Sequence, residues 1–424
     1  MNRRFHYAVV AASTCVVGVL LFGTVAVRSA TPEDSPYTQL GVFSDVLTKI
    51  KLEYVQEPDL KAVTMGAVNG LLESLDPFAS YLNAAQYKQY QAEHGKAKAD
   101  VGLYIARGPG YIRIVDALAG SAADTAGLTT GDVIESINKI STRDMPVAAA
   151  ELLLQGDPGT KVDLTVLTAR QADPSPLTLT RAPLAYPSVT AKLVTDKGPE
   201  AVGVITVGAL LEGRSRDIGQ KVQDLEKQGA KKIMLDLRYC GLGPAEEGIA
   251  VANLFMDSGL ITYTQGQKSR RADSNAVASK AVTKLPLVVL TNRGTAGAAE
   301  VAAAALLDSK RATLVGEPTF GDAAVRKAVT LPDGSAVILA VAKYYAPNGK
   351  AIQDTRVIPG VLQAQFDPPA PIDQIDGDGP APAPVKSTTD LIYERGFKPA
   401  PPAAPGSPLT NNAAPKGPGP TVVK

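Results

Sequence analysis

The segment Lys232-Ile-Met-Leu-Asp-Leu-Arg-Tyr-Cys-Gly-Leu-Gly243 has the pattern of a buried strand followed by a glycine-rich turn. The same order of a short apolar strand and then a helix recurs through residues 201–361. Strands are predicted at 203–207, 232–237 and 286–290, and helices at 215–228, 246–256 and 298–307. Such alternation is typical of an α/β layered fold.

Two regions of different pattern precede this core. Residues 37–97 carry apolar side chains at spacings of three and four, which predicts amphipathic helices. Leu75-Asp76-Pro77 ends one of these helices, and residues 81–94 are predicted to form another. Residues 101–182 contain short β-rich runs between glycine turns, with one helix expected at 146–154. The sequence therefore predicts a multi-domain α/β protein with a helical arm and an inserted β-rich domain.

Composition excludes several functional classes. The 424 residues include 43 basic and 42 acidic side chains, so no global field favours nucleic acid or an acidic substrate. Cys15 and Cys240 are the two cysteines, and His6 and His94 are the two histidines. So few ligands, so far apart, exclude a disulfide framework and argue against a metal site. We expect no metal, no cofactor and no nucleic-acid partner.

The two ends of the chain are unlike its centre. Arg3 and Arg4 precede an uncharged apolar run at residues 8–27, which indicates an export signal. This run could be cleaved or remain as a membrane anchor, and we favour the anchor. The protein is therefore expected in a bacterial cell envelope, periplasmic or extracytoplasmic, either membrane-anchored or secreted. After residue 367 the chain holds 14 of its 32 prolines, which predicts a disordered Pro-rich tail.

A peptide-binding module is indicated by Gly120-Ser-Ala-Ala-Asp-Thr-Ala-Gly-Leu-Thr-Thr-Gly-Asp-Val-Ile134, which resembles a PDZ domain of the permuted bacterial type. Such a domain binds a peptide as an added strand and holds its terminal carboxylate on backbone N–H groups. The alternative is a module that completes the fold and binds nothing, and Gln155 stands where relatives often carry Arg. The resemblance places the peptide-binding residues at Val101, Gly102, Leu103, Tyr104, Leu152 and Leu153.

Three further segments resemble C-terminal processing (tail-specific) serine proteases of family S41. They are Leu75-Asp-Pro-Phe-Ala-Ser-Tyr-Leu82, the segment 233–243 quoted above, and residues 286–349 with their "V-G-E-P-T-F-G" and "A-K-Y-Y-A-P-N-G" runs. Together they cover about residues 37–361. The resemblance implies a protease-like core with ClpP/crotonase-like layers. It also implies five segments: a signal segment at 1–30, the arm at 37–97, the PDZ domain at 98–185, the core at 186–362 and the tail at 367–424.

The positions that carry the family's chemistry are substituted. Thr295-Ala-Gly-Ala-Ala-Glu300 aligns with the family's "S-A-S-A-S-E", so the nucleophilic serine falls on Gly297. The family's lysine base lies 25 residues later, on Asp322, and its orienting glutamine on Arg326. The family's oxyanion turn "N-P-G-G" is replaced by Cys240, Gly241, Leu242 and Gly243. Glycine offers no hydroxyl for acyl transfer, so we expect no intact catalytic residue.

These observations favour a pseudoprotease that binds protein or peptide C-termini and acts as an adaptor or regulator of an active paralogue. One alternative is an active serine-type endopeptidase with a displaced nucleophile, for which the candidates are Thr295, Ser309 and above all Cys240. Another is a structural envelope protein. Family members often assemble through the helical arm and C-terminal segments, so the resemblance leaves an oligomer open. An ion pair between Asp322 and Arg326 is expected to replace the catalytic pair, with solvated charges as the alternative.

Overall fold

The computed structural model describes residues 36–93, 98–108, 110–143, 145–168, 173–196 and 200–364. The export segment at 8–27 and the tail at 367–424 lie outside these residues, as do Cys15, His6 and His94. The chain divides into two compact units, one up to Val68 and the other from Asn69 onward. Within the described residues, no helix combines the length and apolarity needed to cross a bilayer.

The arm contains three helices and one strand. Helix α2 spans Pro36–Glu53, α3 spans Leu60–Glu73 and α4 spans Ala84–Glu93. Our prediction that a helix would begin at residue 81 was wrong, because β1 (Ser80–Leu82) pairs antiparallel with β16 (Ala336–Tyr345) of the core. Asn83 and Gln86 then cap α4 reciprocally, each side-chain oxygen accepting the other's backbone N–H at 3.0–3.1 Å.

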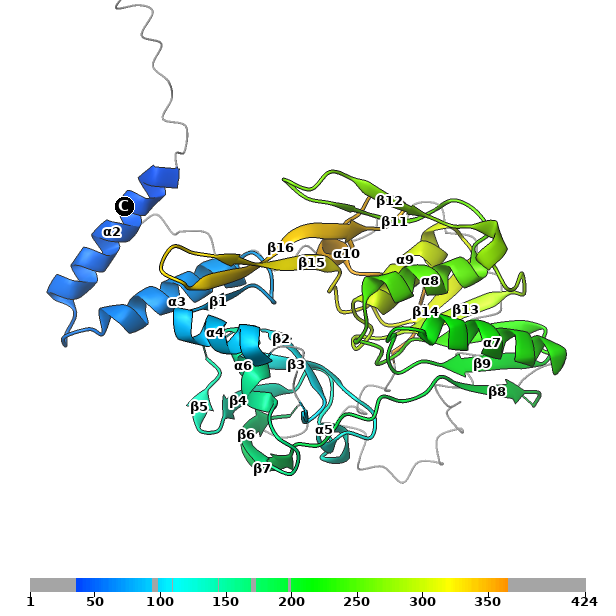
Figure 1. Cartoon of the computed structure of the whole chain (residues 1–424), viewed down its shortest axis with the longest axis horizontal. Helices are drawn as coiled ribbons and strands as arrows, with labels where there is room; N and C mark the ends of the chain where they lie inside the picture. Colours follow the sequence, from blue (N-terminus) through cyan, green and yellow to red (C-terminus); the bar gives the residue numbers. More distant parts are fainter. Residues whose placement is uncertain are drawn as a thin grey trace, which may run out of the picture. The chain divides into compact units, whose positions relative to one another are not determined.

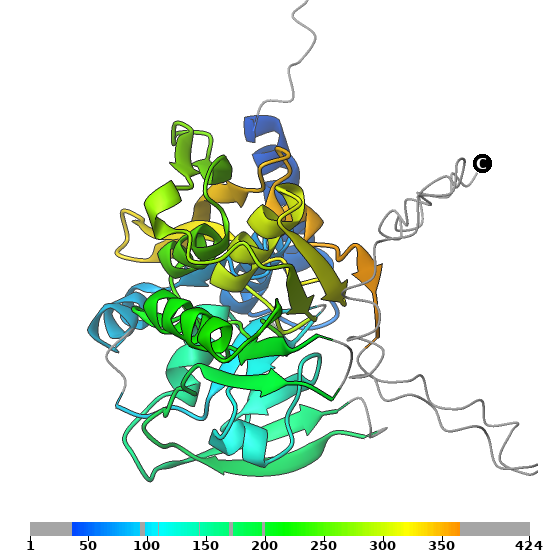
Figure 2. The same ribbon diagram turned by 90° about the vertical axis from the view of Figure 1, so that its right-hand side faces the viewer.

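The inserted domain is an antiparallel sheet in the strand order β2-β3-β4-β6-β7, with β5 beside β4 (Figure 1). Its strands are β2 (Leu103–Arg107), β3 (Ile112–Ala117), β4 (Val133–Ile137), β5 (Ile140–Ser141), β6 (Lys161–Leu167) and β7 (Ser175–Thr180). Helices α5 (Ala122–Thr125) and α6 (Val147–Leu154) complete it. Alternate side chains of the strands, such as Ile105, Ile134 and Leu164, form its buried core. In the turned view these cyan-to-green strands remain together as one β-rich body (Figure 2).

The core sheet has the order β17-β14-β13-β10-β9-β8. All neighbours pair in parallel except β8, which is antiparallel to β9. The strands are β8 (Thr190–Val194), β9 (Val202–Thr206), β10 (Lys232–Asp236), β13 (Leu287–Thr291), β14 (Ala312–Gly316) and β17 (Val361–Leu362). The bounds of β9, β10 and β13 lie within one residue of the three predicted strands, and the predicted α/β architecture is confirmed.

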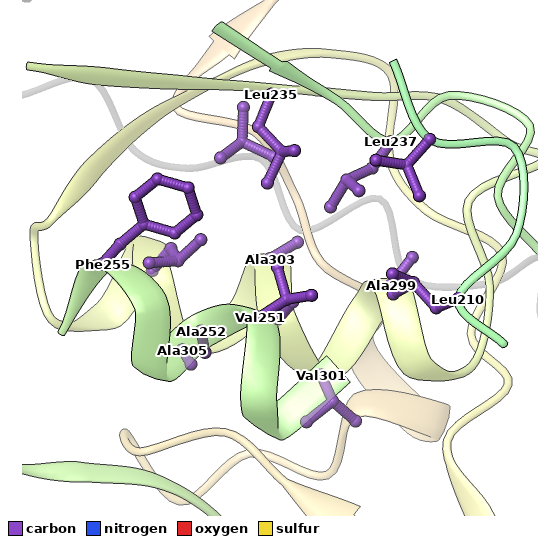
Figure 3. Packing of buried hydrophobic residues seen from close by; sticks show 14 of the residues in the cluster. Leu210, Leu235, Leu237, Val251, Ala252, Phe255, Ala299, Val301, Ala303 and Ala305 are labelled. Carbon is purple, nitrogen blue, oxygen red and sulfur yellow. The ribbon is translucent and has the colours of Figure 1, made fainter. Parts of the chain in front are cut away.

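Helices α7 (Arg214–Lys227), α8 (Ala245–Phe255) and α9 (Ala298–Asp308) cover one face of this sheet (Figure 1). Leu235 and Leu237, from β10 and the turn after it, pack against Val251 and Phe255 of α8 and against the alanines of α9 (Figure 3). Nearly all of α9 is buried, and its small side chains allow α8 close beside it. This packing fixes the N-terminus of α9, where Gly297 lies.

A second sheet in the same unit has the order β1-β16-β11-β12, with β15 also paired to β16. It consists of β11 (Leu260–Gln265), β12 (Ala272–Asn275), β15 (Ala324–Thr330) and β16 (Ala336–Tyr345), together with β1. The short helices η1 (Ala278–Lys280) and α10 (Ile352–Thr355) complete the core. Asp322 lies two residues before β15, so this sheet positions the second residue of the site.

Candidate functional site

Gly297 is the N-cap residue of α9, at the end of a turn that follows β13. Its backbone has φ 58° and ψ −118°, a region that residues other than glycine rarely adopt. Thr295, two residues earlier, is fully buried and donates its hydroxyl to the carbonyl of Leu237 at 2.9 Å. The turn is therefore fixed by side chains that point into the protein, away from the position of the family's nucleophile.

Glu300 joins the positions of the family's serine and lysine. Its buried carboxylate accepts the backbone N–H groups of Gly297 at 3.1 Å, Gly321 at 2.7 Å and Asp322 at 2.6 Å. It also accepts the hydroxyl of Thr319. Burial raises the pKa of Glu300 to about 7, against the lowering effect of these donors. A Cβ atom placed on Gly297 would lie 3.6 Å from the carbonyl oxygen of Asp322, so the two aligned positions are adjacent.

The Asp322 side chain has a partner on each oxygen. Arg326 Nη2 lies 2.5 Å from Oδ1, which is the ion pair that the sequence suggested. Tyr104 of β2 donates its hydroxyl to Oδ2, a contact that the sequence did not suggest. Burial, and then the charge of Asp322, raises the pKa of Tyr104 well above its ordinary value, so its proton stays in this bond.

Aromatic rings surround this ion pair. The Arg326 guanidinium lies over the Phe78 ring at 4.1 Å, within the range of a cation–π interaction. Phe78 also stacks on Tyr104, with ring centroids 6.0 Å apart, and meets Phe320 edge to face at 5.9 Å. The residues aligned with the family's base and orienting glutamine thus take part in a cluster that joins the arm, the PDZ domain and the core.

The loop that aligns with the family's oxyanion turn is tightly held. Cys240 is 1% exposed, and burial raises the pKa of its thiol far above the ordinary range. Its carbonyl accepts the N–H of Ala296 at 3.1 Å. The Leu242 carbonyl accepts the N–H of Leu210 at 2.8 Å. Gly243 has φ 133°, and a Cβ atom there would lie 1.9 Å from the Leu210 carbonyl oxygen, so glycine is required.

A cavity of about 370 Å³ lies at this site. Its lining includes Gly297, Asp322 and Arg326 together with Gly241, Leu242 and Gly243. Cys240 does not line it. Among the described residues, no group of three or more histidines, cysteines or carboxylates could hold a metal ion.

A second cavity of about 540 Å³ lies along the PDZ domain. Of the predicted peptide-binding residues, Gly102, Leu103 and Tyr104 line it. Val101 is instead buried in the domain core, Leu152 is buried and Leu153 packs against that core, so their contact with a peptide stays a prediction. We call this cavity the PDZ groove; its lining also includes Asp100, Glu151, Leu154, Gln155, Tyr186 and Leu242.

Sequence reasoning missed Asp100 and Glu151 as groove residues. Asp100 directly precedes Val101 and Gly102, two of the predicted peptide-binding residues, and its carboxylate was the signal to notice. Glu151 lies one helical turn before Gln155, on the face of α6 that lines the groove. The spacing of four from Gln155 would have placed both on one face.

An antiparallel PDZ sheet beside an α/β core, with a cavity at a helix N-terminus, defines a peptidase-like protein that carries a peptide-binding domain. Comparison with known proteins agrees. The sequence model of Peptidase family S41 matches residues 201–362, and that of a PDZ domain matches residues 113–168. The chain is 32% identical over 381 residues to a carboxy-terminal processing protease of Bacillus subtilis, covering 88% of this chain and 79% of that one.

A carboxyl-terminal-processing protease of Synechocystis is 34% identical over 320 residues, 74% of this chain and 75% of that one. Among solved structures, a photosystem II D1 C-terminal processing protease matches with a TM-score of 0.63 and 29% identity. That match covers 75% of this chain and 86% of the other. The chain belongs to the carboxyl-terminal processing protease family, peptidase family S41.

Proposed function

We propose that this chain is a non-catalytic member of its family that binds protein or peptide chain ends in the PDZ groove. In this proposal it serves as an adaptor or regulator of an active paralogue. The observation that carries the proposal is which residues stand at the positions that align with the family's catalytic residues. Gly297 stands at the serine position, and Asp322 at the lysine position is bound by Tyr104 and Arg326.

The chemistry of acyl transfer supports this reading. The family's mechanism needs a hydroxyl to attack the scissile carbonyl and a neutral amine to accept its proton. Glycine has no side-chain atom to attack with, and both oxygens of Asp322 already accept hydrogen bonds. Loss of the nucleophile in a serine protease costs on the order of 10⁶ in turnover.

The neighbouring nucleophiles favour the same conclusion. The Cys240 thiol is buried, has a strongly raised pKa and lies outside the lining of the cavity, so it is held as a neutral thiol. The Thr295 hydroxyl is buried and engaged with the Leu237 carbonyl. Neither group is poised to replace the missing serine.

We further propose that the protein works outside the cytoplasm of a bacterium, with residues 8–27 as its export segment and membrane anchor. The arm supports a proposal of self-association, because α2 leaves Leu40, Val42 and Val46 exposed.

The direct test incubates the purified full chain with an unstructured protein and follows cleavage by mass spectrometry. We expect no cleavage, and no covalent adduct with a fluorophosphonate or with iodoacetamide under native conditions. Steady proteolysis that disappears in Asp322→Ala or Cys240→Ala would overturn the proposal.

A restoring variant tests whether only the chemistry was lost. It combines Gly297→Ser, Asp322→Lys and Arg326→Gln. Space for the serine exists, because the nearest atoms to a Cβ at position 297 are 3.6 and 3.8 Å away. We expect the triple variant to cleave the unstructured protein slowly, while a variant that carries Gly297→Ser alone stays inert.

A further inference from the structure

The loop of the PDZ domain that would receive a peptide's terminal carboxylate already holds a carboxylate. Asp100 Oδ1 accepts the backbone N–H of Gly102 at 2.7 Å. The backbone N–H groups of Val101 and Leu103 also hydrogen-bond to this side chain; burial raises the pKa of Asp100, and these donors oppose that rise. A second carboxylate, arriving with a peptide C-terminus, would have to displace Asp100 and would lie beside a like charge.

The opposite wall of the PDZ groove adds further acceptors. Glu151 of α6 lines the groove, and its carboxylate has no hydrogen bond or ion pair with any residue that the structure describes. The Gln155 side chain hydrogen-bonds to Asp100, yet its own Oε1 is buried without a partner. An unpartnered buried acceptor is costly, so the groove calls for a ligand that donates hydrogen bonds.

The basic side chains near these acceptors, among the residues that the structure describes, already have acidic partners. Lys98 is the one basic residue in the groove lining, and its exposed ammonium lies 3.5 Å from Asp157. Arg326 interacts with Glu151 through its charge, but its guanidinium is paired with Asp322. The other described groups that face Glu151 are Tyr90 of α4, Asp100 and Asp322, none of which is cationic.

We propose that the PDZ groove selects among peptide chain ends by a basic side chain that the end carries, lysine or arginine, which lies between Asp100, Glu151 and Gln155, and not by the terminal carboxylate itself. The inference rests on the proposed peptide-binding function and names the class of peptide. Leu154, Leu184 and the Tyr186 ring line the same groove and can cover the aliphatic part of such a side chain. An ammonium or guanidinium supplies three or five donors to the converging acceptors.

The test measures fluorescence anisotropy of labelled eight-residue apolar peptides with the full chain at low salt and pH 8. The peptides carry lysine, arginine or norleucine at one internal position, each with a free or an amidated C-terminus. We expect the basic peptides to bind about tenfold more tightly than the norleucine peptide, whether or not the terminus is amidated. Binding that needs the free carboxylate and ignores the basic residue would overturn the inference and leave the proposed function standing. Absence of binding by every peptide would overturn both.

Variants locate the effect in the groove. Glu151→Gln should weaken the lysine peptide about tenfold and leave the norleucine peptide unchanged, and Asp100→Asn should do the same. Glu135→Gln, on β4 and outside the groove lining, is the matched control and should change neither peptide. Glu151→Lys should reverse the preference toward an aspartate-containing peptide. Normal affinity for the lysine peptide in both Glu151 variants, with an unchanged melting temperature, would refute the proposal.

Discussion

Glu300 is the side chain on which the geometry of the cavity at Gly297 depends. One carboxylate receives three backbone N–H groups and one hydroxyl, and it thereby holds the start of α9 against the segment that leads into β15. Because the carboxylate is fully buried, no water can replace it as the acceptor. The residue is therefore structural in this chain, although it belongs to the segment that aligns with the family's nucleophile.

Replacing this carboxylate should lower the stability of the protein. Glu300→Gln puts an amide group in front of backbone donors, which leaves at least one of them without an acceptor. We expect the free energy of unfolding at pH 8 to fall by about 2–4 kcal/mol, measured by urea denaturation. Glu212→Gln is the control, because Glu212 is exposed and its side chain makes no hydrogen bond or ion pair with the described residues; it should change the free energy of unfolding by less than about 0.5 kcal/mol. Equal stability of the two variants would show that Glu300 is not essential to the turn.

Glu151 gives the PDZ groove a dependence on pH near neutrality. Burial, and then the charge of Asp100, raises its pKa to about 7, so the side chain is mostly neutral at pH 6 and charged at pH 8. A cationic peptide favours the charged form, so its affinity should rise across this interval, by up to about tenfold per pH unit. Titration of the lysine peptide with the native chain and with Glu151→Gln checks this. The slope should be smaller in the variant, and an equal slope in both proteins would contradict the role of Glu151.

At the scale of elements, α8 and α9 pack so closely that a glycine is needed between them. A Cβ atom on Gly248 of α8 would lie 2.0 Å from the carbonyl oxygen of Ala298 at the start of α9. The contact is with backbone, so no side-chain rotation can relieve it. The position of the α9 N-terminus therefore depends on this glycine as well as on the alanines that face it.

Gly248→Ala should destabilise the protein by about 1–3 kcal/mol, even though alanine is the better helix former. The control is Gly70→Ala in α3, where nothing lies within 4 Å of the added atom. That change should be neutral or stabilising by up to about 1 kcal/mol. Urea unfolding curves distinguish the two, and a Gly248→Ala protein as stable as the native chain would mean that α8 can move away without cost.

Elements were predictable from the sequence where the pattern is local. The strands around Met234 and Val288 are short apolar runs, and α7 has a clear amphipathic pattern, so their bounds came within two residues. Strand β1 was not predictable in this way, because three residues carry little periodicity and its pairing with β16 joins residues more than 250 positions apart. Tertiary pairing there decides between helix and strand.

In the candidate sites, too, the features that follow from a local sequence pattern were predictable and the long-range contacts were not. The adjacency of Gly297 and Asp322 followed from a fixed spacing in a recognisable pattern, and the structure places both at one cavity. The hydrogen bond from Tyr104 to Asp322 spans 218 residues, and no periodicity announces it. Likewise, the Asp100 side chain folds back on its own loop, which only the conformation of that loop reveals.

At the scale of the whole molecule, the PDZ domain and the core belong to one compact unit. The bond between Tyr104 and Asp322 is one of the contacts that join them, and Tyr104 lines both the cavity at Gly297 and the PDZ groove. The PDZ groove and the cavity at Gly297 therefore share this side chain.

A double-mutant cycle measures this connection. Tyr104→Phe, Asp322→Ala and the double variant should give a coupling free energy of about 1–3 kcal/mol in urea unfolding, as expected for a buried bond to a charged acceptor. A control cycle combines Tyr104→Phe with Asp354→Ala, which removes a remote ion pair with Lys343. Its coupling free energy should be near zero. Coupling near zero in the first cycle would show that the two parts are stabilised independently.

The backbone conformation of Gly297 affects which residues this position can accept. A side chain at φ 58° and ψ −118° carries a strain of about 1–3 kcal/mol, which an enzyme tolerates because catalysis needs the residue there. Glycine adopts this conformation without that strain, so the folded chain keeps a margin over its stability threshold that serine would reduce. On the proposed non-catalytic function, serine at this position alone would lose the margin without a gain in activity, because Asp322 and Arg326 stand where the family has lysine and glutamine. Under that proposal, relatives that share Gly297 are expected to keep glycine at this position.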